Sequence, residues 1–288
     1  MNTDKYFEIG SDHTVCQDFA LDGNIGNIYF AIITDGCSES HELCGEVDFG
    51  ARAVAYLARE AIKGLALTFL DDNEETLHTI GKTIRNKIIE KLKPLRNHLG
   101  LDTRFSDSTL VIAITDGKVT YAYIFGDGGV ITVNKSDTIK YNEVHFLSSA
   151  PLYLSYINDV ERMKAYQLSF GSTPVLNSMN VIPFDGDLNN VSSVITQIKE
   201  INEDLYKLTS FIFKDITSIS VVSDGVKSFQ TIDKEINSIP SINIVKKLVA
   251  FKNTKGEFTK RRMNFFNKDN KANNVSHYDD ISIATIIL

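Results

Sequence analysis

Several aspartates stand where an apolar run of the chain begins or ends. The run 28–34 ends on Asp35, and the run 219–223 ends on Asp224, each followed by a glycine. Runs this short and apolar are typical of strands buried on both faces, so these aspartates are expected at the rim of a sheet. Clustered carboxylates suit Mg²⁺ or Mn²⁺ and phosphate chemistry. The acids considered for this role are Asp18, Asp35, Asp127, Asp224 and Asp279.

The chain contains its own controls for these signals. Asp-Gly is also a common hairpin turn, and Asp116-Gly117 lies between strand-like runs at hairpin spacing, so it needs no function to explain it. Asp22-Gly23 is similarly ordinary. Asp35 and Asp224 differ because loop and helical patterns follow them, not a returning strand.

Other kinds of site find less support in the sequence. Gly81-Lys82-Thr83 resembles the end of a P-loop, but the glycine needed five residues earlier is Thr76. Neither a Gly-x-Ser-x-Gly elbow nor a His-Glu-x-x-His motif occurs. The cysteines, which are odd in number, are expected to be thiols, and a zinc site remains an alternative reading of their spacing with histidine. The residues concerned are Cys16, Cys37, His41 and Cys44.

Helices and strands that could position the acids follow from periodicity. Apolar residues at helical spacing predict helices over 51–65 and 77–92, the second with a capping-box-like start at Asp72 and Glu75. Two further helices are expected over 242–251 and 258–266, and 191–201 is read as helical. Strands are expected over 5–9, 109–114, 119–125, 130–134, 139–143, 163–170 and 281–288, with the four from 109 to 143 forming one antiparallel meander.

This order of elements predicts an α+β fold. Two antiparallel sheets packed face to face, with helices outside, accommodate early strands, paired helices, a central meander and a closing strand. Neither a linker nor an internal repeat divides the chain, so one domain over 1–288 is expected.

Composition excludes some classes of function. The chain has 288 residues, 43% of them hydrophobic, and a formal charge of −7, which argues against a general nucleic-acid binder. No apolar stretch approaches the length needed to cross a bilayer, and the first residues do not resemble a signal peptide. A cytoplasmic protein is therefore expected.

Five short motifs occur in one order along nearly the whole chain. They are Cys16-Gln17-Asp18-Phe19-Ala20, Ile33-Thr34-Asp35-Gly36, Ser108-Thr109 with Phe125-Gly126-Asp127-Gly128, Val222-Ser223-Asp224-Gly225, and Asp279-Asp280-Ile281-Ser282. Together they resemble the metal-dependent serine/threonine protein phosphatases of type 2C, particularly the bacterial branch. Each motif is weak alone, whereas five in order are specific.

The resemblance implies a four-layer α-β-β-α sandwich with a two-metal centre of Mg²⁺ or Mn²⁺ at one end of the sheets. It implies that Asp35 bridges the metals, that Gly36 offers its carbonyl, and that Asp224 and Asp279 complete one metal. Asp18 would lie in the shell around the metals and contact them through water. Asp127 and Asp224 match acids that hold a third, weaker metal in bacterial relatives. The cations would activate a water for hydrolysis of phosphoserine and phosphothreonine.

The chain also departs from the family pattern. The position of the phosphate-binding arginine is taken by His13, which is the candidate for a weak contact with phosphate. The usual acid at the first metal is replaced by Gln17, and the histidine thought to protonate the leaving group by Cys37. His41 is a candidate for that last role. These departures leave two functions open, namely an active phosphatase with a phosphoprotein substrate and a partner kinase, and a weak or inactive regulatory protein of the same fold.

Overall fold

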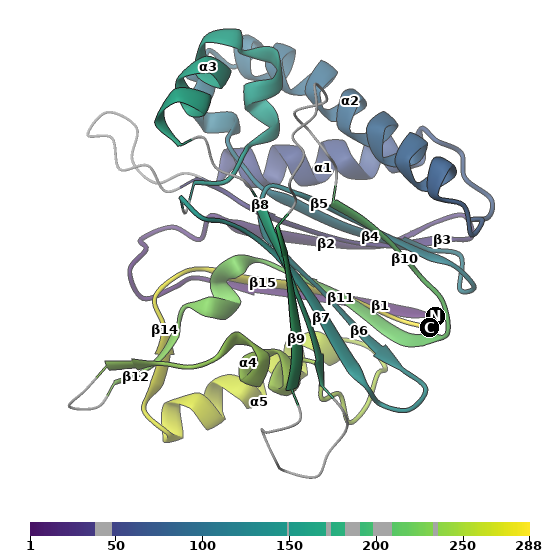
Figure 1. Ribbon diagram of the computed structural model, residues 1–288, viewed down its shortest axis with the longest axis vertical. Coiled ribbons are helices and arrows are strands. Elements are labelled where there is room, and N and C mark those ends of the chain that lie inside the picture. The colour runs from purple at the N-terminus through teal and green to yellow at the C-terminus, as the bar shows by residue number, and fades with distance from the viewer. Residues whose placement is uncertain (38–47, 149, 171–173, 182–190, 198–208, 233–235) are drawn as a thin grey trace.

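The computed structural model describes residues 1–37, 48–148, 150–170, 174–181, 191–197, 209–232 and 236–288. Its architecture follows from two antiparallel sheets that face each other (Figure 1). The first sheet has the strand order β10-β5-β4-β3-β2. Its strands are β2 (Asp18–Ile25), β3 (Ile28–Asp35), β4 (Leu110–Thr115), β5 (Thr120–Phe125) and β10 (Thr209–Phe213).

The second sheet has the order β1-β15-β11-β6-β7-β8-β9, so the first and last strands of the chain are neighbours. Its strands are β1 (Asn2–Glu8), β6 (Gly128–Asn134), β7 (Ile139–Phe146), β8 (Pro174–Val181), β9 (Val191–Gln197), β11 (Ile216–Val222) and β15 (Ile281–Ile287). A small sheet beside it joins β12 (Phe229–Ile232), β13 (Ile236–Ser238) and β14 (Val275–His277).

The unbroken apolar run of β3 has a direct structural reason. Successive side chains of a strand point to opposite faces, and both faces of this strand are covered. Phe30 and Ile32 pack in the core beneath the helices, whereas Ala31 and Ile33 pack in the core between the sheets. A third core lies on the outer face of the second sheet.

Helices cover both outer faces, as Figure 1 shows. The first sheet is covered by α1 (Phe49–Lys63) and α2 (Glu74–His98), and the second by α4 (Ser241–Leu248) and α5 (Phe258–Ala272). The predicted four-layer α-β-β-α sandwich is therefore confirmed. Shorter helices are α3 (Val160–Ser169) and the 3₁₀ turns η1 (Thr103–Ser106), η2 (Leu154–Asn158) and η4 (Asp224–Lys227).

The central meander was predicted as one sheet, and this is wrong. Strands β4 and β5 pair within the first sheet, whereas β6 and β7 pair within the second. The chain crosses from one sheet to the other at 126–127. Periodicity shows that a strand has two buried faces but not which neighbours cover them, so the crossing is invisible in the pattern.

Two other elements differ from expectation. The segment 163–170 belongs mostly to α3 and is not a strand, and its Met163 and Tyr166 are buried one turn apart. Residues 191–197 form strand β9 on the edge of the second sheet, not a helix, and the last residues of the predicted helix lie outside the described part. Helix α2 is capped by Asn73, whose side chain accepts a hydrogen bond from the Glu75 amide.

Several predictions hold. Gly81, Lys82 and Thr83 lie inside α2, which excludes a P-loop there. Asp116 closes the β4–β5 hairpin, where its carboxylate accepts hydrogen bonds from the amides of Lys118 and Val119. Among the described residues, no helix is both long and apolar enough to cross a membrane.

Candidate phosphatase site

Asp18 and Asp35 face each other across two strands of the first sheet. Asp18 opens β2, Asp35 ends β3, and the two residues are direct partners in the antiparallel register. Residues paired in this way have Cβ atoms about 5 Å apart. The next residue, Gly36, is bridged to Ser108, and the Thr109 amide donates a 2.8 Å hydrogen bond to the Asp35 carbonyl. The rim that carries both aspartates is thus held to the start of β4.

Asp127 lies in the turn where the chain passes between the sheets. Gly126 has φ +87° and Gly128 has φ +122°, values that side chains disfavour. A Cβ on Gly128 would also lie 2.8 Å from a Val111 methyl and 3.0 Å from the Val222 carbonyl oxygen. The glycines allow strands of both sheets to approach, and this brings Asp127 to the same end.

The segments that carry Asp224 and Asp279 are held together by hydrogen bonds between Ser223 and Ser282. The Ser223 amide donates to the Ser282 carbonyl at 3.1 Å, and the Ser282 amide donates to the Ser223 hydroxyl at 2.9 Å. A Cβ on Gly225 would lie only 1.8 Å from the Asp280 carbonyl oxygen. The glycine after Asp224 is therefore required by close packing of the backbone, a reason that the sequence motif does not reveal.

These elements bring the other predicted acids within electrostatic reach of Asp35. The pKa of Asp35 is raised well above its ordinary value, first by burial and then by negative charge on its neighbours. Those neighbours are Asp18, Asp224, Asp279 and Asp127. Burial and the charge of Asp224 also raise the pKa of Asp279 to about 6 and that of Asp127 to about 8.

Asp18 is the most deeply buried member of the group. It has no exposed surface, and neither carboxylate oxygen makes a well-formed hydrogen bond within the described structure. Burial raises its pKa to about 7, with nearby Ser223 and Ser282 opposing the shift. A buried carboxylate without donors is costly unless a cation or a proton compensates it.

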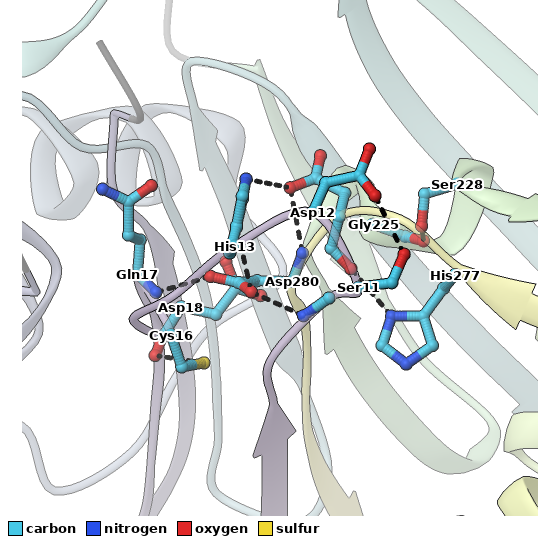
Figure 2. A network of polar contacts seen from close by, with 12 residues as sticks. Ser11, Asp12, His13, Cys16, Gln17, Asp18, Gly225, Ser228, His277 and Asp280 are labelled. Atoms are coloured by element: carbon cyan, nitrogen blue, oxygen red, sulfur yellow. Dashed lines mark hydrogen bonds and ion pairs between the residues drawn. The ribbon is translucent and has the colours of Figure 1, made fainter. Parts of the chain in front are cut away.

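Asp280, the neighbour of Asp279, has a different role. Its two carboxylate oxygens accept hydrogen bonds from the Gly10 amide at 2.7 Å and the Gln17 amide at 2.5 Å. His13 Nδ1 lies 3.0 Å from the same carboxylate, and His13 Nε2 lies 3.8 Å from Asp279. Figure 2 shows Asp280 within this network, between His13 and Gln17. Asp280 thus fixes the segment that leads into Asp18.

The residues that depart from the family pattern also lie here. The Gln17 side chain donates to the Cys37 carbonyl at 3.2 Å, while its buried Oε1 has no hydrogen-bond partner in the described structure. Cys16 and Cys37 form no disulfide within the described part of the chain. His41 and Cys44 lie outside the described residues, so neither the zinc alternative nor the role considered for His41 is tested.

Sequence reasoning missed several residues around the acids. Lys227, at the end of η4, forms a 2.7 Å ion pair with Glu143. Tyr153 precedes η2, and its phenol is hydrogen-bonded to Cys37, with burial and nearby negative charge raising its pKa. No local pattern marks either residue as part of a site, because the partners that place them, Glu143 for Lys227 and Cys37 for Tyr153, come from segments distant in the chain.

A further missed contact attaches α3 to the site. Arg162 donates to both carboxylate oxygens of Asp107, at 3.0 and 2.5 Å. Asp107 is 4% exposed, and its backbone carbonyl accepts from the Cys37 amide at 3.3 Å. This bidentate pair connects the helix to the backbone beside Gly36.

The donor set at the Asp18 and Asp35 end fits a hard divalent cation. It consists of oxygen ligands, and the unpartnered oxygens of Asp18 and Gln17 are acceptors that a cation would satisfy. As they stand, no three described histidine, cysteine, aspartate or glutamate side chains converge closely enough to be a ready-made metal site. The roles of Asp35, Gly36, Asp224 and Asp279 as ligands therefore stay predictions.

Neither protein-family profiles nor curated protein sequences match this chain. Its structure resembles a variant of a bacterial serine phosphatase with arginine replaced by lysine, at 13% identity, covering 99% of this chain and 96% of that one, with a TM-score of 0.54. It also resembles the serine/threonine phosphatase Stp1 from Staphylococcus aureus, at 14% identity, covering 100% and 95%, with a TM-score of 0.53. The unsubstituted bacterial serine phosphatase is 12% identical, with 99% of this chain and 96% of that chain covered and a TM-score of 0.53.

The structural neighbours of the whole chain are thus bacterial serine/threonine phosphatases, and the predicted resemblance is confirmed at the level of fold. At these low identities the likeness concerns the fold alone. Activity has to be argued from the residues of the site.

Proposed function

We propose that this protein is a metal-dependent phosphatase that hydrolyses phosphoserine and phosphothreonine in other proteins. The observation that carries the proposal is that Asp18, Asp127, Asp224 and Asp279 all lie near enough to Asp35 to raise its pKa, at one end of two sheets. Mutually repelling carboxylates raise the free energy of the folded protein, which is hard to explain in a pure scaffold. Cation binding offsets that repulsion.

Different residues of the chain would have different roles in such a site. Asp35, Asp224 and Asp279, with the Gly36 carbonyl, would hold Mn²⁺ or Mg²⁺, and Asp18 would support them from its buried position. When bound, these ions would supply an acidified water and positive charge for phosphate-ester hydrolysis. Asp280 orients the segment carrying His13, the residue at the position of the phosphate-binding arginine.

The substrate and its setting are part of the same proposal. A phosphoprotein, modified by a partner serine/threonine kinase, is the expected substrate in the cytoplasm. The formal charge of −7 gives no support to nucleic acid as a partner. No membrane partner is proposed.

A weak or inactive regulatory protein is the second candidate. It is favoured by His13, whose ring lies 3.0 Å from Asp280 and 3.8 Å from Asp279 and so faces two carboxylates already. A side chain engaged in this way has less capacity to bind a phosphate than a free arginine fork. The two candidates share the fold and differ in turnover.

Hydrolysis of p-nitrophenyl phosphate and of a phosphothreonine peptide separates them. We expect turnover with Mn²⁺, none in excess EDTA, and a loss of about 10²-fold or more in Asp35→Asn. Asp22→Asn is the matched control, because Asp22 lies on β2 but pairs with Lys5 at 2.9 Å, away from the acids. If wild-type turnover is no higher than that of Asp35→Asn, the regulatory candidate is favoured. Full wild-type activity in excess EDTA would contradict the metal-dependent mechanism.

A further inference from the structure

Lys227 is a cation that lies beside Asp224, one of the predicted acids. The two residues begin and end η4, a single 3₁₀ turn, and residues three apart in such a turn lie on the same side. The Lys227 ammonium is 2.7 Å from Glu143, whose side chain is only 7% exposed. Lys227 is therefore held in place by a buried partner from another strand.

Strand register explains why Glu143 is there. In the second sheet, Gly129 of β6 is the partner of Val222 on one side and of Glu143 on the other. Asp224 follows Val222 by two residues, and Asp127 precedes Gly129 by two. One row of paired strands therefore brings three carboxylates to the same end of the sheet.

The charges around Lys227 are consistent with this placement. Burial alone would lower the pKa of Lys227, but attraction by Glu143 and Asp224, and then Asp127, raises it. In return, Lys227 opposes the upward shift of the Asp127 pKa. None of the described ion pairs joins a lysine or an arginine to Asp18 or Asp35, and neither Asp18 oxygen makes a well-formed hydrogen bond there.

We propose that the Lys227 ammonium is the built-in cation of the Asp127 and Asp224 end, and that it keeps a third divalent ion away from Asp127. Divalent ions are then confined to the metal site of the proposed function, to which Asp224 also contributes. The inference rests on the proposed function only in taking Asp35, Asp224 and Asp279 as the ligands of that site. It replaces the third metal expected from the family resemblance with a side chain of this protein.

Counting bound Mn²⁺ tests the inference without an activity assay. Calorimetric titration of the full chain is compared between wild type and the double variant Lys227→Met/Glu143→Gln. The second substitution is included because removing the lysine alone leaves Glu143 buried and unpaired. We expect the double variant to bind one more Mn²⁺ per chain, and addition of Asp127→Asn to remove that extra ion. Equal numbers in wild type and double variant would overturn the inference.

Control variants keep the test decisive if the double variant folds poorly. Asp127→Asn with Lys227 intact should lose no Mn²⁺, whereas loss of one ion would show that Asp127 binds metal beside the lysine and would overturn the proposal. Lys135→Met/Asp215→Asn, which removes an exposed ion pair of 3.4 Å, should keep the wild-type number. If wild type binds no Mn²⁺, the proposed function is contradicted. The inference about Lys227 is tested separately, by whether the double variant binds one more Mn²⁺ than wild type.

Discussion

Asp279 and Asp280 are adjacent, yet we expect their asparagine variants to change stability in opposite directions. Asp280 accepts hydrogen bonds from two buried main-chain amides, one on each oxygen. The substitution Asp280→Asn would keep one acceptor and turn an NH₂ group toward the other amide. Asp279 instead accepts one hydrogen bond from the Asp280 amide at 2.9 Å, which an asparagine oxygen can still accept.

The magnitudes follow from these contacts. Hydrogen bonds to a charged group contribute about 1.5–3 kcal/mol each, so Asp280→Asn should lower the free energy of unfolding by roughly 3 kcal/mol and the Tm by roughly 6–12 °C. The pKa of Asp279, about 6, means that its ionised form is disfavoured in the folded protein. Its side chain is 35% exposed, so water screens the repulsion, and Asp279→Asn should gain at most about 1 kcal/mol.

Guanidinium chloride unfolding in EDTA at pH 7.5, followed by circular dichroism, measures both changes. The Asp279 carboxyl is ionised at this pH, above its pKa of about 6, so the stabilisation by Asp279→Asn should be present in full. It should shrink as the pH falls below about 6 and vanish below 3.8, where the wild-type carboxyl is protonated in both the folded and the unfolded state. Equal stability of Asp280→Asn and wild type, or an equal loss in both variants, would refute the assignment of roles.

Three further outcomes are expected. Gly225→Ala should prevent folding or cost more than about 4 kcal/mol, measured by unfolding, because its Cβ would lie 1.8 Å from the Asp280 carbonyl oxygen. Asp116→Ala should lower stability by about 1–3 kcal/mol, because its carboxylate accepts from three main-chain amides, and phosphatase turnover should not change. Glu8→Gln should cost about 1 kcal/mol at pH 6 and less at pH 9, because the pKa of His277 is raised beside Glu8 and this stabilisation is lost as pH rises through that pKa.

The sequence by itself determined the local elements and the chemistry of the acids. The apolar run of β3 predicted a strand with both faces buried, and the helical spacing of Ala51, Ala55 and Ala58 predicted α1. Aspartates at the ends of such strands predicted a rim of carboxylates. These inferences succeed because side-chain periodicity and strand ends are properties of a few consecutive residues.

In segments with weak apolar patterning, contacts with distant residues determined the secondary structure. Helix α3 has little apolar periodicity, and its position depends on the ion pair between Arg162 and Asp107, 55 residues apart. Strand β9 is an edge strand that forms through pairing with β8. Propensity is a weak guide in such cases, because tertiary contacts supply most of the stabilisation.

Only the tertiary structure decided how the acids are used. The motif Asp279-Asp280 does not indicate which carboxylate joins the acids and which binds the Gly10 and Gln17 amides, because those amides are more than 260 residues away. Nor does any local pattern indicate that Lys227 meets Glu143 across paired strands. Residue types and spacing identify groups capable of chemistry, but charge balance in a site depends on distances that exist only once both sheets have paired and packed.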